Sequence, residues 1–298
     1  MYKDKIAALK KEKDALVLAH YYQSSEIWEY SDAIGDSFEL AKKALNAENK
    51  IIVFCGVRFM AESAKILNRD KKVLLPVLDA GCPMADMITE KELIRLKTLH
   101  PNATVVTYVN SSASVKAQSD ICCTSSNALR VVASIKNDEI IFVPDKNLGS
   151  FVAKNFPDKK FYFCDGHCPI HNSVTEKDVL QAKSKHPNAL LLVHPETREE
   201  VVKYADYVGS TTGIIDFANK SEAKEFIIGT ENSIVDWLES RCPGKTFYSL
   251  TPSFVCKDMK KTTAKELYES LLYEKNVIEL SPQIIDKARL ALQRMVEI

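Results

Sequence analysis

The sequence lacks several features that would each indicate a class of protein. It carries no net charge, because 40 basic residues balance 40 acidic ones, and it has only nine glycines among 298 residues. Without an excess of charge, we expect neither nucleic acid nor a membrane surface as a partner. No apolar run approaches the ~20 residues that span a membrane, and residues 1–6 lack the apolar core of a signal peptide. We therefore predict a cytoplasmic protein.

Cysteine, by contrast, is plentiful, with eight residues. Disulfides rarely persist in the cytosol, so metal binding, catalysis or core packing are the expected uses of these thiols. Three of them recur at nearly equal intervals, each shortly after an apolar segment. Cys82 and Cys168, both followed by proline, lie 86 residues apart, and Cys256 comes 88 residues later.

A pattern of apolar runs and helix-like segments also occurs three times along the chain. The first runs end at His20, Asn110 and His194, and a second run and a helix follow each of them. A third run, such as 77–80 before Cys82, then leads to one of the three cysteines. Continuous apolar strands that alternate with helices are typical of parallel sheets covered on both faces. We predict an α/β fold of three repeated parallel-sheet α/β/α units, related by a pseudo-threefold axis.

The units are expected at 1–83, 84–169 and 170–269, with a C-terminal helix over 270–298 closing the first. In parallel sheets, ligands collect at the carboxyl ends of the strands. All three recurring cysteines follow such ends. The active site is therefore predicted at the common centre of the three units.

The three cysteines indicate a metal centre. Iron–sulfur clusters normally take four cysteine ligands, so three would leave one iron open to bind substrate as a Lewis acid. Two alternatives stay open: buried, inert cysteines, and a zinc site that combines the three with His171. Cys164 could share a metal with Cys168, but the repeat register selects Cys168 and places Cys164 inside a strand.

Hydroxyl groups recur on the same side of each unit. Ser37, Ser125 and the Ser210-Thr211 pair lie where a helix is expected to begin, so hydroxyls and free backbone N–H groups can meet an anion. Helix capping is the alternative use of such residues. Their threefold recurrence favours the anion site.

Titratable and amide side chains follow the first strand of every unit. The segments are His20-Tyr21-Tyr22, Tyr108-Val109-Asn110 and His194-Pro195-Glu196. Imidazole, phenol and carboxylate groups at such places suit proton transfer, although a single one is more often structural. Their repetition favours a catalytic use.

Taken together, these stretches resemble the quinolinate synthase family (quinolinate synthetase A). The matching segments cover nearly the whole chain and are 19–23, 35–37, 54–62, 108–110, 123–128, 194–196, 209–211 and 227–231. One departure concerns the last cysteine. Some members carry a Cys-x-x-Cys-x-x-Cys run there, whereas Cys256 is followed by Lys257, Asp258 and Met259.

The resemblance implies a [4Fe-4S] cluster held by Cys82, Cys168 and Cys256. It implies a transferase that condenses iminosuccinate (iminoaspartate) with dihydroxyacetone phosphate to give quinolinate, phosphate and two waters in NAD biosynthesis. It also suggests functional coupling to the L-aspartate-oxidising enzyme that supplies the imine.

The resemblance further implies roles for the strand-end residues. Glu196 is the expected acid/base, Tyr22 and Tyr108 are assisting phenols, His194 is a further catalytic group, and His171 is a weaker candidate for the phosphate. The expected substrate contacts are His20, Ser37, Tyr108, Val109, Asn110, Ser125, His171, His194, Pro195, Glu196, Ser210 and Thr211.

Three different functions stay open. An aconitase-type iron–sulfur hydro-lyase would use the same open iron without joining two substrates. A zinc hydrolase would bind zinc and tolerate air. A non-enzymatic iron–sulfur or zinc protein would have no use for the hydroxyl groups.

Overall fold

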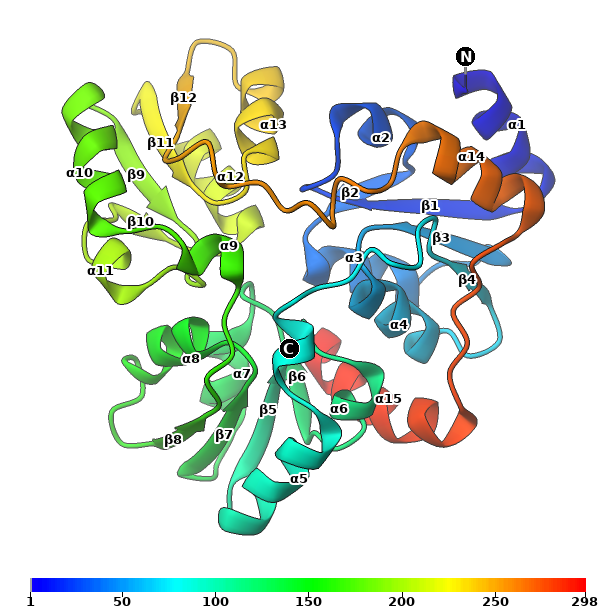
Figure 1. The fold of residues 1–298 in the computed structure, drawn as a ribbon, viewed down its shortest axis with the longest axis horizontal. Coiled ribbons are helices and arrows are strands. Elements are labelled where there is room, and N and C mark those ends of the chain that lie inside the picture. The colour runs from blue at the N-terminus through cyan, green and yellow to red at the C-terminus, as the bar shows by residue number, and fades with distance from the viewer. Residues whose placement is uncertain (1) are drawn as a thin grey trace.

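The computed structural model describes residues 2–298, which form three lobes around a common centre (Figure 1). Each lobe contains one four-stranded, all-parallel sheet, so the predicted fold class is confirmed. The strands, in sheet order, are β2 (Ala33–Gly35), β1 (Ala15–His20), β3 (Ile51–Cys55) and β4 (Lys72–Leu74); β6 (Ile121–Cys123), β5 (Thr104–Tyr108), β7 (Glu139–Val143) and β8 (Lys160–Phe163); and β10 (Tyr207–Val208), β9 (Leu190–Val193), β11 (Glu225–Gly229) and β12 (Thr246–Ser249).

Helices flank each sheet, as the alternating pattern predicts. Those of the first unit are α1 (Lys3–Glu12), α2 (Ser25–Tyr30), α3 (Ser37–Leu45) and α4 (Arg58–Leu67). The second contains the short 3-10 helix η1 (Ala85–Met87), α5 (Glu90–Leu99), α6 (Ala113–Lys116), α7 (Ala128–Ser134) and α8 (Lys146–Ala153). The third contains α9 (Pro169–Asn172), α10 (Glu176–Lys185), α11 (Glu199–Val202), α12 (Thr211–Lys220) and α13 (Ser233–Arg241), and α14 (Ala264–Tyr273) and α15 (Pro282–Glu297) follow.

One hydrogen-bond pair recurs in all three units and sets their register. An aspartate just before the edge strand accepts from a backbone N–H fifteen residues earlier, and its own N–H donates to the carbonyl of that same residue. The pairs and their N–H to carboxylate distances are Val17–Asp32 at 2.8 Å, Val105–Asp120 at 2.8 Å and Leu191–Asp206 at 2.7 Å. The units are therefore repeats at the level of individual hydrogen bonds.

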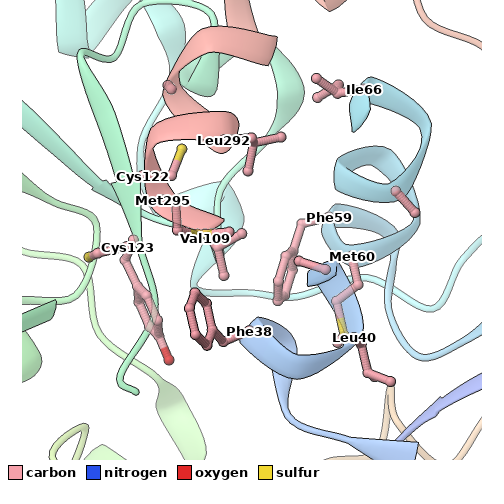
Figure 2. Close-up of a cluster of buried hydrophobic side chains, with 14 of the residues drawn as sticks. Phe38, Leu40, Phe59, Met60, Ile66, Val109, Cys122, Cys123, Leu292 and Met295 are labelled. Carbon is pink, nitrogen blue, oxygen red and sulfur yellow. The ribbon is translucent and has the colours of Figure 1, made fainter. Parts of the chain in front are cut away.

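The largest apolar core joins the first unit, the second unit and α15. Figure 2 shows Phe38 and Phe59 of the first unit facing Val109 of the second, with Leu292 of α15 beside them. These side chains are nearly or fully buried. Removing this apolar surface from water contributes on the order of 25 cal/mol per Å2, so the shared core holds the two units together.

Two expectations about local structure were wrong. The run 77–80 is a loop, and the strand is β4, because Pro76 cannot donate a hydrogen bond to a neighbouring strand. The segment 270–298 is not one helix: it contains the end of α14, a connection and α15.

The C-terminal part also makes contacts that the sequence did not suggest. In the connection, Leu75 N–H donates to Asn276 O at 3.1 Å and Ile278 N–H donates to Val73 O at 2.8 Å, beside an antiparallel bridge from Leu74 to Val277. The helix α15 then packs on α4, α6 and β6, so it contacts two units rather than closing the first alone. The exact unit boundaries stay a prediction. Across residues 2–298, no helix is both long and apolar enough to cross a membrane.

Candidate active site

The carboxyl ends of strands from all three sheets open on one cavity of about 540 Å3. Most of the expected site residues line it: His20, Tyr22, Ser37, Cys82, Tyr108, Asn110, Ser125, Cys168, His171, His194, Glu196, Thr211 and Cys256. Three expected contacts do not line it. Val109 packs in the apolar core, Pro195 lies between two lining residues, and Ser210 caps α12 by accepting from Gly213 N–H at 3.1 Å.

The repeated hydrogen bonds show which strand-end residues are equivalent. His20, Tyr108 and His194 each lie three residues after the N–H donor of the recurring pair. From the spacing of the apolar runs, Asn110 was expected to be equivalent to His20. In the structure, Asn110 lies two residues after Tyr108, so it is equivalent to Tyr22 and Glu196, which lie two residues after His20 and His194. One ring of positions therefore holds two imidazoles and a phenol, and the next holds a phenol, an amide and a carboxylate.

The hydroxyl groups occupy a third set of equivalent positions, Ser37, Ser125 and Thr211. Capping is carried out one residue earlier in two of the units: Asp36 accepts from Phe38 N–H at 2.9 Å, and Ser210 caps α12. In the second unit, α7 starts only at Ala128, so Ser125 lies in the loop before it.

Two of these hydroxyls contact other pocket residues. Ser125 Oγ lies 3.1 Å from His194 Nε2, and Thr211 Oγ1 lies 2.9 Å from the Tyr22 hydroxyl. Both belong to a polar network in the cavity, which is where a bound anion would meet them.

Glu196 is at the centre of the polar network. Its Oε1 accepts from the Tyr108 hydroxyl at 2.7 Å, and its Oε2 lies 2.8 Å from His171 Nδ1. The side chain is only 4% exposed, and burial alone would raise the pKa of Glu196. The positive charge that His194 carries in acid, the neighbouring His171 and the Tyr108 hydrogen bond together outweigh burial and hold the pKa of Glu196 below its usual value. Glu196 is therefore a carboxylate at neutral pH.

Four neighbouring groups, the phenols of Tyr22 and Tyr108 and the imidazoles of His20 and His194, are neutral. Burial, followed by the charge of Glu196, raises the pKa of Tyr22 and of Tyr108 well above its usual value. Burial also lowers the pKa of His20 to about 3 and that of His194 to about 4. At neutral pH, Glu196 is thus a carboxylate beside protonated phenols and the uncharged imidazoles of His20 and His194, and Asp36, Glu231 and Asp258 also line the cavity.

The three cysteine loops share one backbone hydrogen bond. In each unit, a helix follows the third strand in sheet order, which is β3, β7 or β11. A backbone N–H at the start of that helix donates to the carbonyl oxygen of the residue two positions before the cysteine. The donor–acceptor pairs are Arg58–Ala80 at 2.8 Å, Lys146–Gly166 at 2.8 Å and Asn232–Phe254 at 2.9 Å. Cys82, Cys168 and Cys256 are thus structurally equivalent, and all three line the cavity.

The other cysteines have different surroundings. Cys164 lies just after β8 rather than inside it, does not line the cavity, and donates from Sγ to Pro144 O at 3.2 Å. Cys55, Cys122, Cys123 and Cys242 are buried in the sheets or against a helix.

Sequence reasoning gave no role to two buried residues at the end of β11. Thr230 Oγ1 lies 2.7 Å from the Tyr22 hydroxyl and 2.9 Å from His171 Nε2. Glu231 forms a 3.1 Å ion pair with Lys260, whose Nζ also donates to Tyr22 O at 2.6 Å. Both residues directly follow a strand, so the strand-end rule that found His194 would have found them.

Cys168, His171 and Glu196 form the closest set of metal-ligand side chains in the described part of the chain. One donor atom from each lies within 4.8 Å of the others. Fold and pocket together define a class of protein: a threefold-repeated α/β chain whose central cavity combines thiols, imidazoles and a carboxylate.

Comparison with known proteins identifies the family within this class. The family model described as quinolinate synthetase A protein matches residues 4–297. The quinolinate synthase of Caldicellulosiruptor bescii is 53% identical over 295 residues, covering 99% of this chain and 97% of the relative. That of Clostridioides difficile is 49% identical over 290 residues (97% and 95%), and quinolinate synthase 2 of Methanosarcina acetivorans is 48% identical over 295 residues (99% and 95%). The chain belongs to the quinolinate synthetase A family.

Proposed function

We propose that this chain is a quinolinate synthase that condenses iminosuccinate with dihydroxyacetone phosphate to give quinolinate, phosphate and two waters. The observation that carries the proposal is the meeting of three equivalent cysteines with the Glu196 network in one cavity. A volume of about 540 Å3 is within the range of small-molecule pockets, roughly 300–1,000 Å3.

The donor set fits an iron–sulfur cluster. Thiols are its usual ligands, and across residues 2–298 the cysteines that line the cavity are Cys82, Cys168 and Cys256. These three would hold a [4Fe-4S] cluster. When bound, such a cluster supplies a Lewis acid at the iron that has no cysteine ligand.

The protein's own residues supply binding and proton transfer. Ser37, Ser125 and Thr211, with the amide of Asn110, offer hydrogen-bond donors to the substrate carboxylates. Glu196 is ionised and can accept a carbon-bound proton during enolisation and dehydration.

The remaining polar residues assist and orient. Tyr108 and Tyr22 keep their protons, so they act as hydrogen-bond donors or acids rather than as bases. The neutral imidazoles of His20 and His194 orient the substrate, and His171 is a candidate contact of the phosphate. Exclusion of water from the cavity during turnover would protect a reactive imine.

The instability of an imine in water supports a further part of the proposal. Coupling to an L-aspartate-oxidising enzyme would shorten the time that the imine spends free in solution. The expected location is the cytoplasm, where cysteine thiols stay reduced and where both enzymes would meet their substrates.

The test is metal analysis of protein purified without oxygen, together with a condensation assay. We expect about four irons and four sulfides per chain. They should be lost in Cys168→Ser and kept in the matched variant Cys164→Ser, because only Cys168 lines the cavity. Zinc without sulfide would contradict the cluster. Turnover of a single substrate by hydration, without condensation, would favour the hydro-lyase.

The acid/base role of Glu196 is tested by Glu196→Gln. We expect kcat to fall by about 100-fold or more, the usual scale for a general acid or base, with substrate binding changed much less. Iron content is the control, since it should match that of the unaltered protein. Full turnover in Glu196→Gln would exclude this role.

A further inference from the structure

Three donors in the cavity are arranged for a single ion rather than for a cluster. His171 Nδ1 lies 3.2 Å from Cys168 Sγ and 2.8 Å from Glu196 Oε2. The three donor atoms come from three different side-chain types and meet within 4.8 Å of one another. Cluster ligands, by contrast, bind different irons and so lie further apart than the ligands of one ion.

These distances are close to those of a zinc site. Typical bonds are about 2.3 Å to sulfur and 2.0–2.1 Å to nitrogen or oxygen, which in a tetrahedron separate the donors by roughly 3.3–3.6 Å. The observed separations of 3.2 and 2.8 Å are a few tenths of an ångström shorter. Hydrogen bonds within the set account for this, because donors that share a proton approach more closely than donors that share a metal.

Each of the three residues is also held by a buried partner. His171 Nε2 lies 2.9 Å from Thr230 Oγ1, which leaves Nδ1 directed at Cys168 and Glu196. The Tyr108 hydroxyl binds Glu196 Oε1 at 2.7 Å, and Cys168 N–H donates to Asp145 Oδ2 at 3.0 Å. Such partners fix ring and carboxylate orientation in protein metal sites.

We propose that the cluster-free protein binds one Zn2+ through Cys168 Sγ, His171 Nδ1 and Glu196 Oε2, with the fourth position open to the cavity. On binding, the Cys168 thiol loses its proton to solvent, and the proton between His171 Nδ1 and Glu196 gives way to the metal, so that His171 carries its ring proton on Nε2, beside Thr230 Oγ1. A mixed sulfur, nitrogen and oxygen set with one open position suits zinc, which such ligands bind more tightly than Fe2+.

Zinc and the cluster then exclude one another, because Cys168 belongs to both ligand sets. This second part rests on the proposed function, whereas zinc binding itself does not. The newly made chain, before its cluster is assembled, is the form that zinc would capture.

The experiment is a zinc titration of reduced, cluster-free full-length protein against a competing chromophoric chelator. We expect one zinc per chain, with affinity at least 10-fold weaker in Cys168→Ser, His171→Gln and Glu196→Gln. The matched thiol variants Cys82→Ser and Cys256→Ser should bind zinc like the unaltered protein. Thr230→Val, which removes the hydroxyl partner of His171 Nε2 and also that of the Tyr22 hydroxyl, should weaken binding about 10-fold.

Co2+ in place of zinc provides a second measurement that does not depend on affinity. The intensity of thiolate-to-cobalt charge transfer should indicate one thiolate, and it should be lost in Cys168→Ser but kept in Cys82→Ser. A spectrum with three thiolates, or zinc affinity that depends on Cys82 and Cys256 but not on His171, would overturn the proposed ligand set. Circular dichroism of each cluster-free variant establishes that it is folded.

Reconstitution separates the two parts of the proposal. Zinc-loaded protein should fail to take up iron and sulfide, and removal of zinc with a chelator should restore uptake. Full cluster loading with zinc retained would overturn the exclusion while leaving the zinc site. Normal cluster loading in a protein that binds no zinc would overturn the zinc site and leave the proposed function intact.

Discussion

The loop that carries Cys82 and the loops that carry Cys168 and Cys256 have the same backbone arrangement but different side chains behind them. Two positions after the strand that precedes each helix, the residue is Val57 after β3, Asp145 after β7 and Glu231 after β11. All three are almost fully buried. Repetition thus places the cysteines, whereas the chemistry behind each cysteine is particular to its unit.

The carboxyl groups of Asp145 and Glu231 hold their cysteine loops directly. Asp145 accepts from Leu148 N–H at 2.7 Å and from Cys168 N–H at 3.0 Å. Glu231 accepts from Ser233 N–H at 2.9 Å and from Cys256 N–H at 3.4 Å.

The first unit uses packing instead. Val57 lies in the large apolar core, where it contributes burial rather than hydrogen bonds. The Cys82 loop is therefore tied to its helix through the backbone bond from Arg58 to Ala80. Three substitutions, or sets of substitutions, test this comparison.

The largest effect is expected from Asp145→Leu. The change leaves two N–H groups without their acceptor, at about 1–3 kcal/mol each, so we expect about 3 kcal/mol less free energy of unfolding. The measurement is urea unfolding of the cluster-free protein. Asp145→Asn keeps an acceptor oxygen and should lose clearly less. Equal losses in the two variants would show that the hydrogen bonds do not hold the loop.

Val57→Ala should have an intermediate effect with a different cause. Removing two buried methyl groups should lower the free energy of unfolding by about 1–2 kcal/mol, through lost packing alone. Iron content measured on protein purified without oxygen should stay at the unaltered value, because the Arg58–Ala80 bond is made by the backbone. Loss of iron in Val57→Ala would mean that this side chain positions the Cys82 loop after all.

The smallest effects should come from the recurring aspartates, where the units are most alike. Asp32→Ala, Asp120→Ala and Asp206→Ala each remove one hydrogen bond to a strand N–H and should each lower the free energy of unfolding by about 1 kcal/mol. Lys10 and Lys183 also pair with Asp32 and Asp206, but partly exposed pairs add little. Urea midpoints that differ widely among the three variants would contradict the equivalence of the units.

Most of the fold could be predicted because buried parallel strands have a strong signature. Runs such as Ile51–Cys55 and Glu139–Val143 are almost wholly apolar, since both faces of these sheets are covered. Prediction was wrong where local signals compete. The apolar residues of 77–80 resembled a strand, but Pro76 ends the strand before them.

The prediction for the C-terminal region was wrong for another reason. Whether α15 covers one unit or two depends on which apolar surfaces remain open after the sheets have formed, and spacing within the helix does not contain that information. Leu292 and Met295 face a core to which both the first and second units contribute (Figure 2).

The sequence alone determined the repeated pattern, most of the strand ends and the side of each sheet on which Cys82, Cys168 and Cys256 emerge. It could do so because strand burial and chain direction are local properties that leave a periodic pattern. Only the tertiary structure decided which side chains meet across the centre. Cys168 and His171 are neighbours on one turn, whereas Tyr108 comes from the second unit and Glu196 from the third, so their 2.7 Å hydrogen bond depends on how the lobes pack. The same packing buries Glu196 while giving it hydrogen bonds from Tyr108 and His171, which favour its ionised form.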